Sequence, residues 1–391
     1  MRKQLILAAA LAAALPAYAQ QTIKIGVILP YSGQFADGAT QLDNGIKLYV
    51  QQKGDTVAGR KIEFVRKDTG GIAPDVAKRL AQELVVRDKV DILAGFLLTP
   101  NAMAAGDVSA EASKFMVVMN AATSIITTKS PYMARTSLTT PQLNESLGTW
   151  AATKGKIKSI YTMVSDYGPG HDAEQAFHAA FKAAGGNLLG SVRFPTANPD
   201  FAAFVQRAKD QNPEAIFVWI PGGAQPAALG KALSERGIDA RKTKVLGQLE
   251  LTSDEARKAM GEVSLGMITS AHYDDNLDTP LNREFVAGFT KLSGGRKPNF
   301  FAIGGYDGMH LIYEALKKTG GKTDGKALIE AAKGMKWQSP RGPISIDPET
   351  RDVVQTVYIQ RVEKVGDELR NVVFDKVENV KDPVKERMKK K

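Results

Sequence analysis

The chain is 391 residues long, carries a net charge of +10 and contains no cysteine. The absence of cysteine excludes thiol catalysis, thiolate zinc sites and iron–sulfur clusters, and a chain of this length can bury a core that needs no disulfides. Much of the positive charge lies at the two ends of the chain, and no stripe interleaves aromatic with basic side chains, so nucleic acid is not an expected partner.

The N-terminus has the pattern of a secretory signal peptide. Arg2 and Lys3 precede an apolar run over residues 5–15 that is too short to span a bilayer. A proline ends this run, and the small residues at positions 17 and 19 suit cleavage before Gln20. We therefore predict that residues 1–19 are removed when the protein is exported to the periplasm.

The last eleven residues, 381–391, form a basic tail. Six of them are basic and two are acidic. A segment with such a charge excess buries little apolar surface. We therefore predict a frayed, solvated end rather than a binding arm.

Short apolar, β-branched runs alternate with helical patterns, which is typical of parallel strands joined by crossover helices. In the first series the predicted strands are 23–29, 62–65, 92–94 and 115–119, with helices near 38–52, 73–87 and 101–112. In the second series the predicted strands are 159–164, 188–194, 215–219 and 244–247, with helices near 168–184, 201–210 and 225–236. Each series indicates one open α/β sheet of the Rossmann-like kind, so the sequence predicts two lobes of similar size.

The segments after the second series do not fit two domains in tandem. The patterns there are a strand at 266–271, helices near 280–291, 303–319 and 325–333, and β-rich segments at 353–361 and 370–374. This order indicates a chain that returns to the first lobe and then crosses once more. We predict one lobe from 22–139 with 272–344 and another from 140–271 with 348–377, joined by three crossover segments. Ligands of open α/β sheets bind beyond the carboxyl ends of the strands, which places the site in the cleft between the lobes.

Several motifs resemble those of a known family. Residues 23–33 read Ile-Lys-Ile-Gly-Val-Ile-Leu-Pro-Tyr-Ser-Gly, and further motifs lie at 44–45, 91–95, 120–123, 166–168 and 305–307. They resemble periplasmic binding proteins of the leucine/isoleucine/valine type, and the resemblance covers essentially the whole mature chain. It implies the type I periplasmic-binding-protein fold, in a monomer without metal or cofactor that closes around a small molecule. It also implies docking onto the inner-membrane permease of an ABC importer.

The resemblance assigns a carboxylate-binding site to two loops of the first lobe. Thr99 follows a predicted strand, where the family places a hydroxyl that binds the ligand carboxylate. Ala121, Ala122 and Thr123 match the next loop, which in the family supplies backbone N–H groups and a second hydroxyl. Neutral donors at a strand end that leads into a helix can bind an anion without a buried cation. Tyr167 matches a family tyrosine that closes over the ligand from the second lobe.

Two positions depart from the family's amino-acid binders, which hold the ligand ammonium with two acidic residues. At the first position the chain has Thr140, and at the second it has Leu249, with Glu250 one residue further on. A buried ammonium without an acidic partner is costly in free energy. Either Glu250 takes the role after a shift of one residue, or the ligand has no ammonium.

The predicted pocket is also larger and more apolar than in amino-acid binders. Gly38 stands where they often carry an aromatic lid, and Phe301 falls where the family has an aromatic wall. Leu97 and Leu98 add apolar lining beside the carboxylate site. These features favour an aromatic or aliphatic carboxylic acid as the ligand. A branched-chain amino acid remains the alternative.

Two other classes of function use different chemistry or a different partner. The four histidines are not spaced as metal ligands, and the sequence contains no nucleotide-binding glycine motif. No two carboxylates have a spacing that indicates general acid–base catalysis. An enzyme is therefore not expected. A periplasmic ligand sensor that partners a receptor would use the same fold, and the sequence leaves that alternative open.

Overall fold

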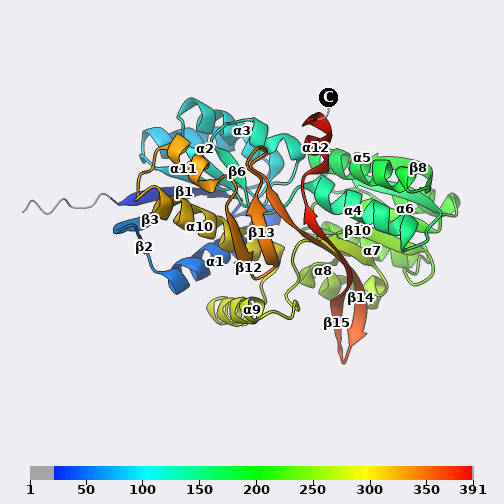
Figure 1. Cartoon of the computed structure of the whole chain (residues 1–391). Helices are drawn as coiled ribbons and strands as arrows, with labels where there is room; N and C mark the ends of the chain where they lie inside the picture. The colour runs from blue at the N-terminus through cyan, green and yellow to red at the C-terminus, as the bar shows by residue number, and fades with distance from the viewer. Residues whose placement is uncertain (1–21, 390–391) are drawn as a thin grey trace, which may run out of the picture.

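The computed structural model describes residues 22–389, which form two lobes that are each built on one β-sheet (Figure 1). The fold is mixed α/β with mostly parallel strands, as predicted. The predicted signal peptide, residues 1–19, lies outside the described residues. Among residues 22–389, every helix is too short or too polar to serve as a membrane span.

Six strands in the order β2-β3-β1-β4-β5-β6 form the sheet of the first lobe. Their bounds are β1 (Ile23–Leu29), β2 (Thr56–Val57), β3 (Arg60–Asp68), β4 (Ile92–Gly95), β5 (Phe115–Val118) and β6 (Met133–Arg135). All neighbours are parallel except β2 and β3. The sequence predicts β1, β3, β4 and β5, whereas β2 and β6 are too short to carry a recognisable pattern.

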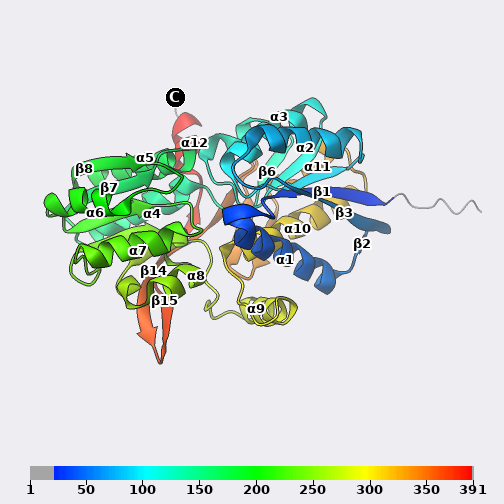
Figure 2. The same cartoon turned by 180° about the vertical axis from the view of Figure 1, so that it is seen from behind.

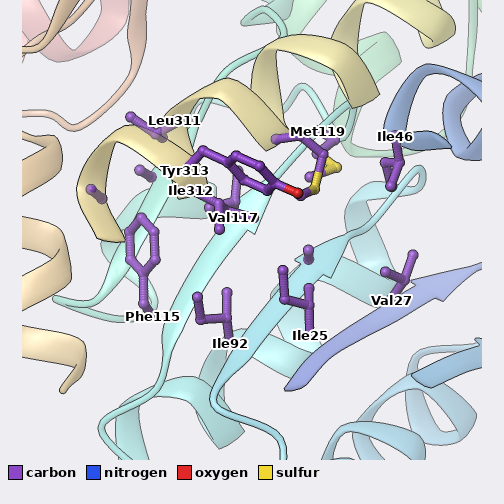
Figure 3. Close-up of a cluster of buried hydrophobic side chains, with 14 of the residues drawn as sticks. Ile25, Val27, Ile46, Ile92, Phe115, Val117, Met119, Leu311, Ile312 and Tyr313 are labelled. Carbon is purple, nitrogen blue, oxygen red and sulfur yellow. The ribbon is translucent and has the colours of Figure 1, made fainter. Parts of the chain in front are cut away.

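Helices from two distant parts of the sequence cover this sheet. They are α1 (Ala36–Lys53), α2 (Pro74–Val86), α3 (Thr99–Glu111), α9 (Pro280–Leu292), α10 (Phe300–Lys318) and α11 (Gly325–Ala332). Ile25 and Ile92 of the sheet lie across from Ile312 of α10 in the buried core of this lobe (Figure 3). The helices after residue 280 therefore complete the first lobe.

Two glycines allow α1 and α10 to pack closely. A Cβ on Gly45 would lie 2.0 Å from Ala302 O, and a Cβ on Gly305 would lie 2.2 Å from Leu42 O. Any larger residue at either position would push the helices apart. The glycines in the motifs at 44–45 and 305–307 are therefore needed for the close packing of these two helices.

The sheet of the second lobe has the order β12-β13-β14-β11-β10-β9-β7-β8, with β15 paired to β14. The strands are β7 (Ser159–Ser165), β8 (Asn187–Phe194), β9 (Ala215–Trp219), β10 (Lys244–Gln248), β11 (Ile268–Ala271), β12 (Lys336–Ser339), β13 (Gly342–Ile346), β14 (Val353–Val365) and β15 (Glu368–Val380). The helices are α4 (Thr140–Thr153), α5 (Gly168–Ala183), α6 (Phe201–Asp210), α7 (Gln225–Glu235) and α8 (Asp254–Met260). Strands β7 to β11 run parallel, and β14 runs antiparallel to β11.

The chain runs from the first-lobe sheet to the second-lobe sheet at 136–139, returns at 272–279 and crosses again between α11 and β14, at 333–352. The two lobes lie side by side (Figure 2). The hairpin β12–β13 lies within the third of these segments. It is hydrogen-bonded to β14, while its Ile346 belongs to the hydrophobic core of the first lobe. The hairpin therefore contacts both lobes. The exact residue boundaries of the two lobes that the sequence predicts remain a prediction.

The expectation of a frayed, solvated end is wrong for residues 381–389. Pro383–Lys389 forms helix α12, and Lys385 is buried. Lys385 Nζ lies 2.6 Å from a carboxylate oxygen of Asp352, and Lys381 Nζ lies 2.9 Å from Asp347. The third crossover thus supplies acidic partners for the basic tail. Local composition cannot reveal partners from a distant segment.

Candidate functional site

A cavity of about 200 Å³ lies between the two lobes. The first lobe contributes Gln34, Phe35, Asp37, Gly38, Leu97, Asn299, Phe300 and Phe301. The second lobe contributes Pro221, Gly222, Gly223, Glu250, Ser253 and Glu255. The lobes approach closely here, since a Cβ on Gly223 would lie 3.3 Å from Gln34 O. The cavity is therefore enclosed by both lobes.

Three predicted pocket residues meet on one wall of this cavity. A Cβ on Gly38 would lie 3.0 Å from Phe301 Cε2 and 3.2 Å from Leu97 Cδ1. Gly38 lies near the start of α1 and Phe301 near the start of α10, so two helix ends set this wall. Phe301 and Leu97 therefore already fill the space beside Gly38, and a larger residue at this position would displace them. We call Gly38, Leu97 and Phe301 the apolar slot. Leu98 is buried in the same hydrophobic core as Leu97 but does not line the cavity.

Thr99 and Thr123 come together beside the start of the second-lobe helix α5. The backbone N–H and the hydroxyl of Thr123 both donate to Thr99 Oγ1, at 3.4 and 3.2 Å. Because Thr99 Oγ1 accepts both bonds, its own proton is available to an anion at the N-terminus of α3. A Cβ on Gly168 would lie 3.4 Å from Thr123 Oγ1. The pair thus adjoins the second lobe but is not part of the lining of the 200 Å³ cavity.

Arg135, at the end of β6, holds the loop 121–124 from behind. Its buried guanidinium donates to Ala121 O at 3.1 Å and to Thr123 O at 2.8 Å. The N–H of Ala121 bonds to Phe96 O at 3.0 Å, so it is not free for a ligand. Sequence reasoning missed Arg135, because nothing in its local pattern distinguishes it from a surface arginine.

Glu250 reaches the cavity from the short helix η3 (Leu249–Thr252), directly after β10. Both carboxylate oxygens accept from Gln248 Nε2, at 3.0 and 3.1 Å. Gln248 Oε1 accepts from Asn144 Nδ2 at 2.7 Å and from Trp219 Nε1 at 3.2 Å, which fixes the amide. Burial raises the pKa of Glu250 to about 7. Gln248, Asn144 and Trp219 were also missed by sequence reasoning.

Tyr167 lies at the N-terminus of α5 and packs against Trp219, with ring centroids 5.5 Å apart. Burial, and then the negative charge of Glu250, raise the pKa of the Tyr167 phenol. The phenol therefore stays protonated over the physiological range. Tyr167 belongs to the second lobe and is not part of the lining of the 200 Å³ cavity.

The two positions where amino-acid binders carry acids are uncharged in the structure. Thr140, the first residue of α4, is buried, and its N–H donates to Ala122 O at 2.8 Å. Its hydroxyl has no hydrogen-bond partner among the described residues. Leu249 is buried and apolar. The shift of one residue brings Glu250, rather than Leu249, to the cavity.

An ion-pair network crosses the rim of the cavity. Arg296 Nη2, from the first lobe, lies 2.5 Å from Asp37 Oδ1 and 3.3 Å from Glu255 Oε1 of α8. These two rim carboxylates therefore have a cation. Glu250 forms no ion pair within residues 22–389, so its charge is available to a ligand donor.

The groups around the cleft are suited to binding a ligand through hydrogen bonds and apolar contacts. Hydroxyls, an aromatic wall and one unpaired carboxylate surround the cleft. Across the described part of the chain, no three His, Asp or Glu side chains are placed to hold a metal ion together.

The sequence profile of the family described as periplasmic binding protein matches residues 22–367. The chain belongs to this family.

"Leu/Ile/Val-binding protein homolog 6" of Brucella melitensis is 43% identical over 356 residues, which cover 91% of each chain. The solute-binding protein of an ABC transporter from Rhodopseudomonas palustris BisB5, solved with 3,4-dihydroxybenzoic acid, is 51% identical with a TM-score of 0.89. A counterpart from R. palustris HaA2, solved with p-hydroxybenzoic acid, is 41% identical with the same TM-score. Both matches cover 93% of this chain and 99% of the other.

The family and these neighbours are solute-binding proteins of transporters, which confirms a binding protein rather than an enzyme. The predicted family and its two-lobed type I fold are confirmed as well. Membership also implies that the protein acts in the periplasm.

Replacing Thr99 by Ala should weaken binding of a carboxylate ligand by about 1–3 kcal/mol, because a buried acceptor loses its donor. The melting temperature should change little. Calorimetric titration with 3,4-dihydroxybenzoate and with leucine covers both ligand classes. Thr40→Ala removes an exposed hydroxyl that bonds only to Ala36 O and serves as the control. Unchanged affinity in Thr99→Ala would place the carboxylate elsewhere.

Replacing Glu250 by Gln should stabilise the ligand-free protein at about pH 8 and leave it unchanged near pH 4.5. The pKa of Glu250 is about 7 in the fold, against an ordinary value of 4.5 for a solvated glutamate, so the folded state binds the proton more tightly than the unfolded chain does. The ionised carboxylate therefore costs stability increasingly as the pH rises through this window. Since the side chain is partly exposed, we expect a gain of about 1–2 kcal/mol.

Urea unfolding at the two pH values measures this difference, and Glu262→Gln, at an exposed site in the same lobe, is the matched control. An equal gain at both pH values would show that burial does not perturb Glu250.

Proposed function

We propose that this protein is the substrate-binding component of an ABC importer and that its ligand is an aromatic carboxylic acid with a ring hydroxyl. The observation that carries the proposal is the unpaired carboxylate of Glu250 in the same cavity as the apolar slot. The hydroxybenzoic acids bound by the two R. palustris neighbours support it.

The size and lining of the cavity suit one aromatic ring. Its volume is about 200 Å³. A buried apolar cavity of roughly 150 Å³ can hold benzene, so one ring with small substituents fits this cavity. Gly38, Leu97 and Phe301 all line the cavity. In the proposed complex the ring lies against the side chains of Leu97 and Phe301.

Thr99 is proposed to bind the ligand carboxylate, and Thr123, which donates twice to Thr99 Oγ1, is proposed to hold that hydroxyl in place. Thr99 begins α3, and Gly168 begins α5 next to Thr123, so the N-termini of two helices from different lobes lie close together. Unpaired N–H groups and the helix dipole favour an anion there. The free hydroxyl proton of Thr99 adds a directed hydrogen bond. Two lobes that both contribute donors would bind the carboxylate fully only when the cleft closes.

Glu250 is proposed to accept a hydrogen bond from the ring hydroxyl. Gln248 occupies one side of the carboxylate and leaves the other oxygen lone pairs to a donor in the cavity. A phenol satisfies them and brings no charge of its own. An aliphatic acid or plain benzoate offers no donor, so Glu250 would lose water without compensation.

A branched-chain amino acid is the second candidate, and the same residue favours it. Its ammonium could pair with Glu250, and the Brucella relative is named as a Leu/Ile/Val-binding protein homologue. The two candidates differ in what Glu250 meets: a neutral hydroxyl or a full positive charge.

Calorimetric titration with 4-hydroxybenzoate, benzoate and leucine tests the proposal. We expect 4-hydroxybenzoate to bind about 1.5–3 kcal/mol more tightly than benzoate, the usual contribution of one hydrogen bond to a charged group. We also expect it to bind more tightly than leucine. Glu250→Leu should remove the preference for the hydroxyl. Glu250→Gln keeps a neutral acceptor and should preserve much of it.

Leucine provides the contrary outcome. Tight leucine binding that disappears in Glu250→Gln would overturn the aromatic ligand in favour of the amino acid, because an amide cannot replace the charge that an ammonium requires.

A further inference from the structure

We propose that the C-terminal segment 381–389 positions the carboxylate-binding loop 121–124 through a buried chain of charges, Lys385–Asp352–Arg135. This inference rests on the proposed function only in that the loop binds the ligand carboxylate. It gives the basic tail a role at the site.

Arg135 sets the orientation of the loop peptides. Its guanidinium donates to the carbonyls of Ala121, Thr123 and Ser124, at 3.1, 2.8 and 3.4 Å. In a trans peptide the C=O and the next N–H point in opposite directions. The N–H of Ala122 is therefore turned away from Arg135, and so is that of Ser124, which bonds to Asp172 of α5 at 2.9 Å. One buried arginine thus directs the amides of the loop toward the opposite side.

Asp352 connects Arg135 to the tail. Its Oδ1 accepts from Arg135 Nε and Nη2 at 3.0 and 2.7 Å, and its Oδ2 lies 2.6 Å from Lys385 Nζ. Lys385 also donates to Thr127 Oγ1, in the segment that follows the loop. All three charged side chains are buried, so each depends on the others for compensation. Removal of Lys385 leaves Asp352 with a free oxygen and Arg135 with a partner that can move.

A second contact joins the tail to the loop directly. Asp382 Oδ1 accepts from the N–H groups of Val384 and Lys385 and so begins α12, while its Oδ2 accepts from Ser124 Oγ at 2.5 Å. On the other side Arg387 pairs with Glu145 of α4 at 2.7 Å. Helix α12 lies at the junction of the lobes (Figure 1). The tail therefore contacts the loop and the second lobe at once.

The surface of α12 supplies a matched control. Lys389 lies one turn beyond Lys385 and pairs with Glu349 and Glu386 at 2.7 and 2.8 Å. These pairs are much more exposed, and within residues 22–389 neither carboxylate bonds to the side chain of Arg135, Asp352 or Lys385. Lys389→Met thus removes the same charge from the same helix without touching the buried chain.

A double-mutant cycle tests whether Lys385 acts through the carboxylate site. We expect Lys385→Met to raise the Kd for 4-hydroxybenzoate on the order of 10-fold, as loss of a supporting residue behind a binding group does. Lys385→Arg should restore most of the affinity, and Lys389→Met should leave it unchanged. When Thr99 is already replaced by Ala, Lys385→Met should raise the Kd by a much smaller factor than it does in the wild type. Both substitutions then act on the same carboxylate contact, so their effects on binding are not independent.

Two results would overturn the inference. One is wild-type affinity in Lys385→Met; the other is a double variant whose Kd rises by the full product of the single factors, which indicates a general structural effect. If Lys385→Met does not fold, Asp382→Asn enters the same cycle, because Asp382 reaches the loop at Ser124. If the wild type binds leucine instead, the aromatic proposal fails alone, and leucine, which also carries a carboxylate, replaces 4-hydroxybenzoate in the cycle.

Discussion

In the proposed complex the ligand carboxylate is transferred from water into the cleft between the lobes. Hydrogen-bond donors of the protein must replace the lost water, and the other features of the site follow from this requirement. Thr99 at the start of α3 and the start of α5 bring neutral donors from opposite lobes to one place. Neither lobe alone completes the set. Closure and binding are then one event, and the ligand stabilises the closed form by its preference for it. Three crossovers restrict the lobes to a hinge, which makes that closed form reproducible.

The other end of the ligand is recognised at a cost in stability. Glu250 is half-buried beside the apolar slot and forms no ion pair within residues 22–389, and its partial burial raises its pKa. The fold retains an ionisable group where a neutral one would be more stable. A carboxylate without a cation is expected at a position that selects among ligands. Only a ligand that carries a hydrogen-bond donor compensates the carboxylate for its lost water.

The parts of the fold that local sequence determines could be predicted. Apolar runs gave β1, β4 and most of the parallel strands, and the order of later segments gave the return of the chain to the first lobe. Gly38, Leu97 and Phe301 could be nominated from the family resemblance, and they meet at one wall. The choice between Leu249 and Glu250 stayed open, because one residue of shift cannot be judged without the turn that follows β10.

The buried chain of charges could not be predicted. Arg135, Asp352 and Lys385 come from a short strand, a crossover and the tail, and each alone resembles a solvated surface residue. Their burial depends on partners that only the tertiary fold brings together. The hairpin β12–β13 was missed for a related reason, since its strands are short and only partly buried.

The most direct measurement is a crystal structure of the protein with 3,4-dihydroxybenzoate. We expect the carboxylate within about 2.6–3.2 Å of Thr99 Oγ1, the ring against Leu97 and Phe301, and a ring hydroxyl on Glu250. A ligand bound in the reverse orientation, or a carboxylate outside the loops of Thr99 and Thr123, would contradict the account.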